Sequence, residues 1–473
     1  MKVAFVASEC TPIVKVGGLG DVIGSLPKAL HNLGVNTTVL IPGYCTIDYS
    51  SWVKTENFVI HFAGEPLKIE VFSTQLPGSV VQLTAFRENK YIGSGGVYFS
   101  KTAFSSSQDE INRFVVFNEA VACWLSKETN KVDIVHAHDW HAALLLHLLD
   151  DGGVKVKKVF TIHNLANQGM SSLEVDAKLG GHIDHDKLLA WDATDHSLDL
   201  MLQGLGRADW ITTVSPTYAK EILTPVFGEK LEEVLRTREG RLTGILNGID
   251  YDFWNPRHDP LLKNNYDQST YKLGRKENRI HLEQLVGLKI NPQKPLFGFI
   301  GRLTNQKGLD LILESLPEIL RNGELLVLGK GAPEIENALA QKANESNGEM
   351  VYVNTQENFH EDFEHLMYGA SDFMLIPSKF EPCGLVQMIG MHYGAVPIAH
   401  SVGGLRDSIE DGHTGFLFAD YSAKSLTGAV NRAAALFQVG DIGSIIEKGM
   451  SQDFSWGKSA LEYVKLYEKV SKL

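Results

Sequence analysis

Residues 296–320 read LFGFIGRLTNQKGLDLILESLPEIL and contain the pattern that decides the fold. The first five residues form a continuous apolar run, which is typical of a strand buried on both faces of a parallel sheet. From Asp310 to Leu320 the apolar residues recur at helical spacing, so a helix follows the strand. A strand, a short turn and a helix in this order indicate part of a βαβ unit.

The same alternation of apolar runs and helical segments extends over the whole chain. Two doubly wound domains with six strands each suit 473 residues better than one sheet of twelve strands, so the α/β class with two Rossmann-like domains is expected. We expect the boundary near Asn247, with one domain over residues 1–246 and another over 247–456. The twelve expected strands are Val3–Ala7, Thr38–Ile41, Ile134–His136, Val159–Ile162, Ile211–Val214, Gly244–Leu246, Leu296–Ile300, Leu325–Leu328, Met350–Val353, Phe373–Ile376, Val396–Ala399 and Phe416–Phe418.

Composition excludes several functional classes. The formal net charge of −13 argues against nucleic acid as a partner, although it allows a small anion held by local cations. No segment reaches the ~18 apolar residues that a membrane span needs, and the apolar run at the N-terminus is too short for a signal peptide. The four cysteines are scattered without a C-x-x-C pair, which favours reduced thiols in the cytoplasm.

Three polar segments follow strands of the first domain, where ligands of open α/β sheets bind. The glycine-rich segment Lys15–Val22 precedes a helix and suits an anion, but a tight turn alone would explain it equally well. Its spacing matches neither the dinucleotide fingerprint nor a P-loop. The histidines of His136–His141 could suggest a metal, although Asp139 there is better explained as a group that orients a neighbour or a sugar hydroxyl. His163 could donate to a sugar oxygen or be a satisfied buried histidine.

The second domain offers cations and a carboxylate in corresponding places. Arg302 and Lys307 lie between a strand and a helix N-terminus, which suits a diphosphate, although a solvated basic turn is the alternative. Glu381 begins a loop after the domain's fourth strand, where a carboxylate can accept hydrogen bonds from sugar hydroxyls. Gly384 and Leu385 then lead into a helix whose amides could face a phosphate.

Taken together, the motifs resemble those of bacterial glycogen synthases and plant starch synthases over essentially the whole chain. They occur in the family's order, as Lys15–Val22, His136–His141, Thr161–Ala166, Ile245–Asp250, Phe253–Pro256, Gly301–Gly308, Glu381–Gln387, Gly403–Asp407 and Asp453–Trp456. The resemblance implies the glycosyltransferase-B fold, with two Rossmann-like domains facing a cleft. It also implies that the tail, residues 457–473, returns to the first domain.

The implied activity is retaining transfer of glucose from ADP-glucose to the non-reducing-end 4-OH of an α-1,4-glucan, namely glycogen, starch or a maltooligosaccharide. No metal and no cofactor are implied, because the nucleotide sugar is a substrate. The alternatives are a synthase that uses UDP-glucose, another retaining glycosyltransferase or an epimerase of the same fold, and a catalytically inactive glucan-binding paralogue. Oligomeric state, acceptor length and allosteric control stay open.

The resemblance also assigns roles to individual residues. Those with catalytic roles are Asp139, His163, Arg302, Lys307 and Glu381. Those that bind substrate are Lys15, Gly17, Gly18, Asp21, Asn164, Asn247, Phe359, Cys383, Gly384 and Leu385. Phe359 stands where the family commonly has a tyrosine that stacks on the nucleotide base. Ile389 stands where other retaining transferases have a second glutamate, which is typical of the synthases.

Overall fold

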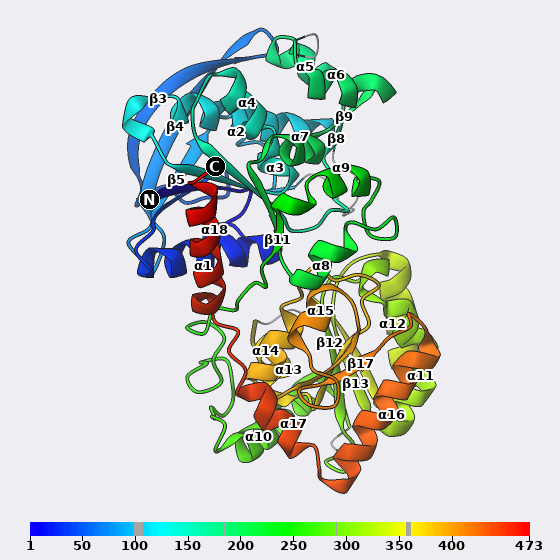
Figure 1. Cartoon of the computed structure of the whole chain (residues 1–473). Coiled ribbons are helices and arrows are strands. Elements are labelled where there is room, and N and C mark those ends of the chain that lie inside the picture. Colours follow the sequence, from blue (N-terminus) through cyan, green and yellow to red (C-terminus); the bar gives the residue numbers. More distant parts are fainter. Residues whose placement is uncertain (99–106, 183–184, 290, 356–360) are drawn as a thin grey trace. The chain divides into compact units, whose positions relative to one another are not determined.

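The computed structural model describes residues 1–98, 107–182, 185–289, 291–355 and 361–473, and these form two compact units (Figure 1). Unit 1 comprises Met1–Gly248 together with Trp456–Leu473, and unit 2 comprises Ile249–Ser455. The boundary expected from the sequence, after residue 246, lies close to this division. None of the helices described is both long enough and apolar enough to span a membrane.

The sheet of unit 1 has the strand order β11-β10-β7-β6-β1-β2-β5-β4-β3. Its strands are β1 (Lys2–Val6), β2 (Asn36–Pro42), β3 (Val53–Phe62), β4 (Glu65–Gln75), β5 (Gln82–Arg87), β6 (Ile134–His138), β7 (Lys157–Ile162), β10 (Trp210–Thr213) and β11 (Leu242–Gly244). All neighbours pair in parallel except β3 with β4 and β4 with β5. The strand order reverses between β1 and β6, which is the switch point where ligands of such sheets bind.

The expectation of six strands in this unit is wrong, because strands β3, β4 and β5 extend its sheet to nine described strands. Successive residues of β3 alternate between exposed and more buried positions, so they form no continuous apolar run. An antiparallel strand with one face in solvent has this alternation, whereas the strands expected from the sequence are continuous apolar runs buried on both faces. The six strands that were expected are all present, with ends shifted by one or a few residues.

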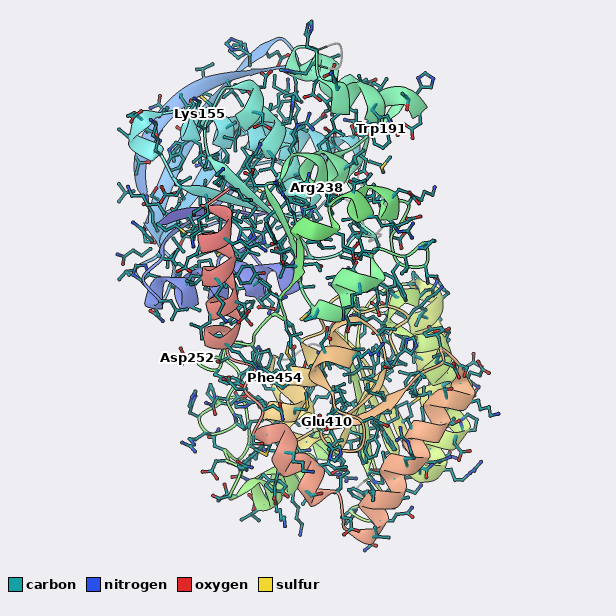
Figure 2. The ribbon with its side chains drawn as sticks, viewed as in Figure 1. Lys155, Trp191, Arg238, Asp252, Glu410 and Phe454 are labelled. Carbon is teal, nitrogen blue, oxygen red and sulfur yellow. The ribbon has the colours of Figure 1, made fainter. Side chains whose placement is uncertain are left out.

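The helices of unit 1 begin and end where local signals permit. Ser107, Asp199 and Ser215 cap three of them by accepting a backbone N–H of the first turn. The helices are α1 (Gly18–Asn32), α2 (Gln108–Leu125), α3 (Trp140–Ala143), α4 (Leu145–Asp151), α5 (Glu174–Leu179), α6 (Lys187–Asp192), α7 (Leu200–Arg207), α8 (Pro216–Glu221), α9 (Glu232–Thr237) and α18 (Trp456–Val470), with a small hairpin of β8 (Met170–Ser172) and β9 (Ser197–Asp199). After α9, Arg238 (labelled in Figure 2) donates to the carbonyl oxygens of Leu205 and Gly206 and so fastens this end to α7.

The C-terminal helix α18 belongs to unit 1, where it packs beside α1 (red beside blue in Figure 1). Its buried face joins the core formed by β1, β2 and α1. The Tyr467 hydroxyl lies 2.7 Å from Nδ1 of His136, and Ser459 Oγ donates to the carbonyl oxygen of Leu246 at 2.5 Å. These polar contacts and the buried apolar face attach the last segment of the chain to the first domain.

Unit 2 has a parallel sheet with the order β14-β13-β12-β15-β16-β17. The strands are β12 (Leu296–Ile300), β13 (Glu324–Gly329), β14 (Met350–Asn354), β15 (Phe373–Ile376), β16 (Val396–His400) and β17 (Phe416–Phe418), and all six coincide with expected runs. Numbered within the unit, the order is 3-2-1-4-5-6, which is that of a dinucleotide-binding fold. Its switch point lies between β12 and β15. The helices are α10 (Tyr271–Val286), α11 (Leu309–Asn322), α12 (Pro333–Glu345), α13 (Glu361–Ala370), α14 (Val386–His392), α15 (Gly403–Ser408), α16 (Ala423–Val439) and α17 (Gly443–Met450).

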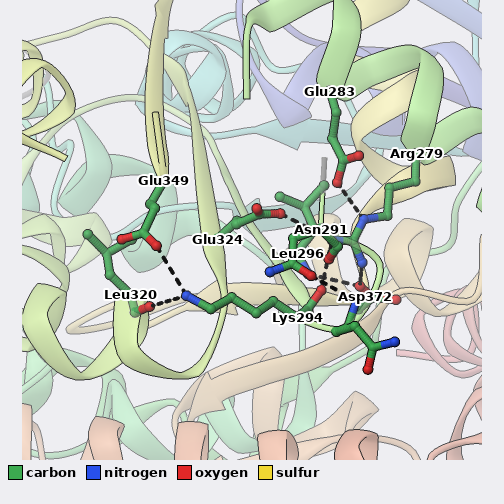
Figure 3. Close-up of polar contacts among 10 residues, drawn as sticks. Arg279, Glu283, Asn291, Lys294, Leu296, Leu320, Glu324, Glu349 and Asp372 are labelled. Atoms are coloured by element: carbon green, nitrogen blue, oxygen red, sulfur yellow. Dashed lines mark hydrogen bonds and ion pairs between the residues drawn. The ribbon is translucent and has the colours of Figure 1, made fainter. Parts of the chain in front are cut away.

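A buried ion cluster connects α10 to the sheet of unit 2 (Figure 3). Arg279 of α10 contacts Glu283 at 2.6 Å, Asp372 at 2.8 Å and Glu324 at 3.2 Å, and it also donates to the carbonyl oxygen of Lys294. One guanidinium therefore serves three carboxylates, which come from α10 itself, from β13 and from the turn before β15. Burial raises the pKa of Glu324 to about 7, which the nearby Arg279 opposes.

Candidate active site

The site residues of unit 1 lie at the carboxyl ends of β1, β6 and β7. Parallel pairing of these strands places the segments that follow them at one edge of the sheet. The glycine turn follows β1, Asp139 follows β6 and His163 follows β7. The switch point between β1 and β6 therefore coincides with the residues that the sequence analysis selected.

The glycine turn is held in place by Glu9, a residue that the sequence analysis did not select. One oxygen of this buried carboxylate accepts the N–H groups of Val16 and Gly17, at 2.6 and 2.8 Å. Its other oxygen accepts the hydroxyl of Tyr98 at 2.6 Å. Burial raises the pKa of Glu9, while these three hydrogen bonds oppose the shift. The only signal in the sequence was an acid directly after an apolar strand, and one acid without its partners indicates no site.

Helix α1 starts at Gly18, directly after this turn, with Gly17 at the N-cap. The glycine N-cap has no side chain to cap the helix, and Gly20 donates to the Gly17 carbonyl oxygen at 3.1 Å. Among the described residues no partner is found for the N–H groups of Gly18 and Leu19, which could therefore bind an anion. Lys15 and Asp21 flank the turn and form an ion pair with 2.8 Å between Nζ and Oδ1. The Lys15 side chain is 44% exposed, so its ammonium can exchange this partner for a ligand phosphate at little cost.

The side chain of Asp139 holds the backbone of the segment that follows β7. Its Oδ1 accepts the N–H of His163 at 2.7 Å and that of Asn164 at 3.4 Å. Its backbone has a φ of 56° and a ψ of 178°, a strained conformation for a residue with a side chain. Burial raises the pKa of Asp139 to about 7, against the effect of these hydrogen bonds. The carboxyl therefore titrates near neutral pH.

His163 is half-buried, and its imidazole meets that of His138. Nε2 of His163 lies 2.9 Å from Nδ1 of His138, the last residue of β6. Burial lowers the pKa of His163 to about 3, so the ring is neutral at physiological pH. His136 and His141 lie nearby on β6 and α3, and among the residues described no group of three or more histidine, cysteine or acidic side chains could hold a metal ion.

Asn247 lies just before the end of the first segment of unit 1 and has a buried side-chain amide. Among the described residues its Oδ1 atom has no hydrogen-bond partner. An unsatisfied buried acceptor costs about 1–3 kcal/mol. Such an oxygen is suited to receive a donor from a ligand, as the sequence analysis expects of Asn247.

In unit 2 the loops after β12 and β15 bring Lys307 and Glu381 together. Lys307 Nζ lies 2.6 Å from Glu381 Oε2, and the Ser378 hydroxyl donates to the same oxygen at 2.8 Å. Gly308 joins Lys307 to α11 with a φ of 73°, and a Cβ atom there would lie 2.0 Å from the Pro377 carbonyl oxygen. Only glycine allows this close approach, which places the lysine turn against the loop that carries Glu381.

A buried glutamine, Gln387, holds the loop from Cys383 to Leu385 in place. Gln387 donates to the carbonyl oxygens of Cys383 and Gly384 at 3.1 and 2.9 Å. Gly404 allows the same loop to pass closely, since a Cβ atom there would be 2.1 Å from the Cys383 carbonyl oxygen. Leu385 occupies the N-cap of α14. The geometry of the loop is thus set by Gln387 and by the close approach that Gly404 allows.

Arg302 follows β12 and is exposed, and none of the hydrogen bonds or ion pairs found in the described ranges involves its side chain. It therefore has the freedom that a phosphate-binding arginine needs. Phe359, expected to stack on a base, lies outside the described residues.

Titration of Asp139 leads to a testable prediction about stability. The pKa is raised from about 3.9 in an unfolded chain to about 7 in the fold. Its contribution to stability is therefore complete below pH about 4 and is lost as the pH rises through about 7. We expect Asp139→Asn, which keeps an acceptor and cannot ionise, to match the wild type at pH 4 or below in chemical denaturation. Its advantage should grow as the pH rises from about 4 to about 7 and stay constant above that range.

Asp139→Ala is the contrasting variant for this experiment. It removes the acceptor for the N–H groups of His163 and Asn164, so we expect it to be destabilised at every pH. A difference between the asparagine variant and the wild type that does not change between pH 5 and pH 8.5 would contradict the assignment of a buried, titrating carboxyl.

Comparison with known proteins places this arrangement among the glucan synthases. Residues 2–237 match the starch synthase catalytic domain, and residues 283–436 match glycosyl transferases group 1. The chain is 37% identical to a glycogen synthase of Bacillus subtilis (strain 168), over 100% of this chain and 99% of that protein.

Solved structures agree with the sequence comparison. The catalytic domain of starch synthase IV from Arabidopsis thaliana, bound to ADP and acarbose, matches with a TM-score of 0.89 and 30% identity, over 100% of this chain and 99% of that one. A sucrose-phosphate synthase from Thermosynechococcus elongatus matches with a TM-score of 0.62 at 17% identity, over 99% of this chain and 98% of that one. The second similarity concerns the fold alone.

Proposed function

Because the chain belongs to the glycogen and starch synthase family, as a glucan-elongating glucosyltransferase, we propose that it takes its glucose from ADP-glucose. We further propose that it adds the glucose to the 4-OH at the non-reducing end of an α-1,4-glucan, with retention of the α-configuration. The observation that carries this proposal is the pairing of Lys307 with Glu381 at the switch point of unit 2. This pair puts a cation that would suit the leaving diphosphate beside a carboxylate that would suit sugar hydroxyls.

The choice of ADP-glucose is supported by the relative from Arabidopsis thaliana, whose structure contains ADP and which is 30% identical over the whole chain. UDP-glucose remains the alternative donor, because the base contact expected of Phe359 lies outside the described residues. We propose that neither a metal nor a cofactor is required, since the nucleotide diphosphate is itself the activated leaving group.

The charges of unit 2 suit the departure of a nucleoside diphosphate. As the bond to the anomeric carbon breaks, negative charge grows on the diphosphate and positive charge on the sugar. Arg302 and Lys307 would stabilise the first, and groups placed for developing charge are often the largest catalytic contribution. Glu381 would accept hydrogen bonds from sugar hydroxyls, with Ser378 holding the carboxylate in place.

We do not assign a carboxylate nucleophile to the reaction. Retention by double displacement needs a carboxylate free to attack the anomeric carbon. Glu9, Asp139 and Glu381 all accept hydrogen bonds from protein groups, so each is engaged in positioning. We therefore propose that the acceptor attacks on the face from which the diphosphate leaves, and that a phosphate oxygen takes the acceptor's proton. Exclusion of water would then protect the donor from hydrolysis.

The decisive experiment supplies glycogen primer with radiolabelled ADP-glucose or UDP-glucose and measures nucleotide release and primer-bound glucose. We expect label in the glucan with ADP-glucose and release of one nucleotide for each glucose added. Preferential incorporation from UDP-glucose would reverse the donor assignment. Free epimerised sugar would indicate an epimerase, and glucan binding without nucleotide release would indicate an inactive paralogue.

The role of Glu9 in holding the glycine turn gives a prediction for donor binding. Glu9→Ala removes the acceptor of two turn amides and of Tyr98, so the turn loses its position. Since hydrogen bonds to charged groups contribute about 1.5–3 kcal/mol each, we expect the KM for ADP-glucose to rise about tenfold or more. Glu9→Gln keeps an oxygen for the amides and should stay within a few-fold of the wild type. Equal KM values for the alanine variant and the wild type would refute this role.

We also propose that the enzyme works in the cytoplasm. All four cysteines are free, and a reducing compartment would keep them so.

A further inference from the structure

The imidazole of His138 is held rigidly in the core of unit 1. It packs against the rings of Phe5 and His136, with centroid distances of 5.5 and 4.1 Å, and the residue has no exposed surface. From this position its Nδ1 atom meets Nε2 of His163 at 2.9 Å. His138 itself is too deeply buried to touch a ligand, so any effect it has on a substrate must pass through His163.

The contact between the two rings contains a single proton. Burial lowers the pKa of both imidazoles, that of His163 to about 3, so both are neutral at physiological pH. A neutral imidazole carries hydrogen on only one of its nitrogens. Either His138 donates through Nδ1, or His163 donates through Nε2, and the two arrangements leave different atoms on the far sides of the rings.

The far side of His138 decides between these arrangements. Its Nε2 atom is buried and, among the described residues, has no hydrogen-bond partner. If His163 were the donor, this Nε2 would carry a hydrogen with nothing to receive it. Orphaned buried N–H groups are rare in proteins, whereas an unused lone pair is tolerated better. His138 therefore carries its hydrogen on Nδ1 and donates it to His163.

We propose that His138 fixes His163 as the tautomer protonated on Nδ1, so that His163 presents a hydrogen-bond donor to an oxygen of the donor sugar. This inference rests on the proposed function for the identity of the ligand, but not for the tautomer. In this role His138 is a positioning residue, and the ligand atom opposite His163 must be an acceptor, such as a hydroxyl or ring oxygen.

The backbone around His163 completes this arrangement. Asp139 accepts the N–H of His163 at 2.7 Å, which fixes the main chain, while His138 fixes one side of the ring. His163 is half-buried as a residue, and its Nδ1 atom makes no hydrogen bond among those found in the described ranges, so Nδ1 is the polar ring atom that could bind a ligand. The main chain of His163 is thus held by Asp139 and its ring by His138, and these two residues are neighbours in the sequence.

The first test needs only the wild-type protein. Histidine labelled with ¹⁵N in the ring distinguishes protonated from unprotonated ring nitrogens by NMR, and a His163→Gln variant assigns the signals. We expect the hydrogen of His163 on Nδ1, both without ligand and with ADP-glucose. A hydrogen on Nε2 would overturn the inference, whether or not the protein proves to be a glucan synthase.

The second test uses two variants of similar size at position 138. Asparagine can place an N–H group where Nδ1 of His138 lies, whereas leucine cannot donate. We expect His138→Leu to lower kcat/KM for ADP-glucose by about tenfold, which is equivalent to about 1.4 kcal/mol. The kcat/KM of His138→Asn should stay within about threefold of the wild type, which corresponds to less than about half of that free energy. Equal values for the two variants would overturn the inference.

His147→Leu is the matched control, because His147 is buried in unit 1 on α4 and takes no part in the site. We expect its kcat/KM to equal that of the wild type. If the position 138 variants do not fold, the NMR measurement on the wild type still decides. If the wild type transfers no glucose at all, the proposed function fails while the tautomer measurement stands independently.

Discussion

We expect alanine in place of Lys307 to lower kcat by about a hundred- to a thousandfold and to leave the fold of unit 2 intact. Removing one group that stabilises developing negative charge typically costs this much in rate. Lys307 is a cation at the switch point of unit 2, where it pairs with Glu381, the carboxylate proposed to bind sugar hydroxyls. Its side chain is 22% exposed, so its loss opens no large cavity. Steady-state kinetics with saturating ADP-glucose and glycogen, alongside circular dichroism, would measure both parts of the prediction.

Because Lys307 and Glu381 are paired, the effects of removing each of them should not be independent. Glu381→Ala should lower kcat by a comparable factor, but the double variant should lose far less than the product of the two effects. Residues that share one contact act as a unit and are not additive. Lys379→Ala is the matched control, since this exposed lysine lies in the same loop and contributes only its backbone N–H to Gln306. Near-normal turnover of Lys307→Ala, or full additivity of the pair, would contradict the assigned roles.

The largest expected effect on stability is that of Arg279→Met in unit 2. The variant leaves Glu283, Glu324 and Asp372 without the guanidinium that serves all three (Figure 3). Breaking a buried ion pair by removing one partner costs about 3–5 kcal/mol, because an uncompensated charge stays buried. We expect a loss of this size in the free energy of unfolding of unit 2, measured by denaturant titration.

Lys294→Met is the control for this variant, because Lys294 pairs with Glu349 at 3.2 Å in a more exposed position of the same cluster. Exposed pairs contribute about 0–1 kcal/mol, so we expect little change. The raised pKa of Glu324, about 7, also sets the pH dependence. Without Arg279 the penalty grows as the pH rises through this value, since more carboxylate is charged. Equal stability of the arginine and lysine variants would show that the cluster contributes nothing beyond surface charge.

The sequence by itself determined the fold class, the six strands of unit 2 and which polar segments follow the strands of each sheet. Strands buried on both faces must be continuously apolar, so their pattern is readable without a structure. Turns that follow such strands must lie at the carboxyl edge of a parallel sheet, so Lys15, Asp139, His163, Lys307 and Glu381 could be placed at that edge from their spacing alone. Their individual roles came from the family resemblance.

Only the tertiary structure decided how these residues are held. Strands β3, β4 and β5 escaped prediction. In β3 and β4 exposed and buried positions alternate, because one face lies in solvent, and in β5 the polar residues Gln82 and Thr84 interrupt the apolar run although most of the strand is buried. Glu9 meets Tyr98 from 89 residues away, Lys307 meets Glu381 across 74 residues, and Arg279 meets Asp372 across 93. Contacts over such separations depend on which strands become neighbours in a sheet, and no local pattern of residues encodes that pairing. The partners that set the charge, position and tautomer of a site residue are therefore decided by the folded chain.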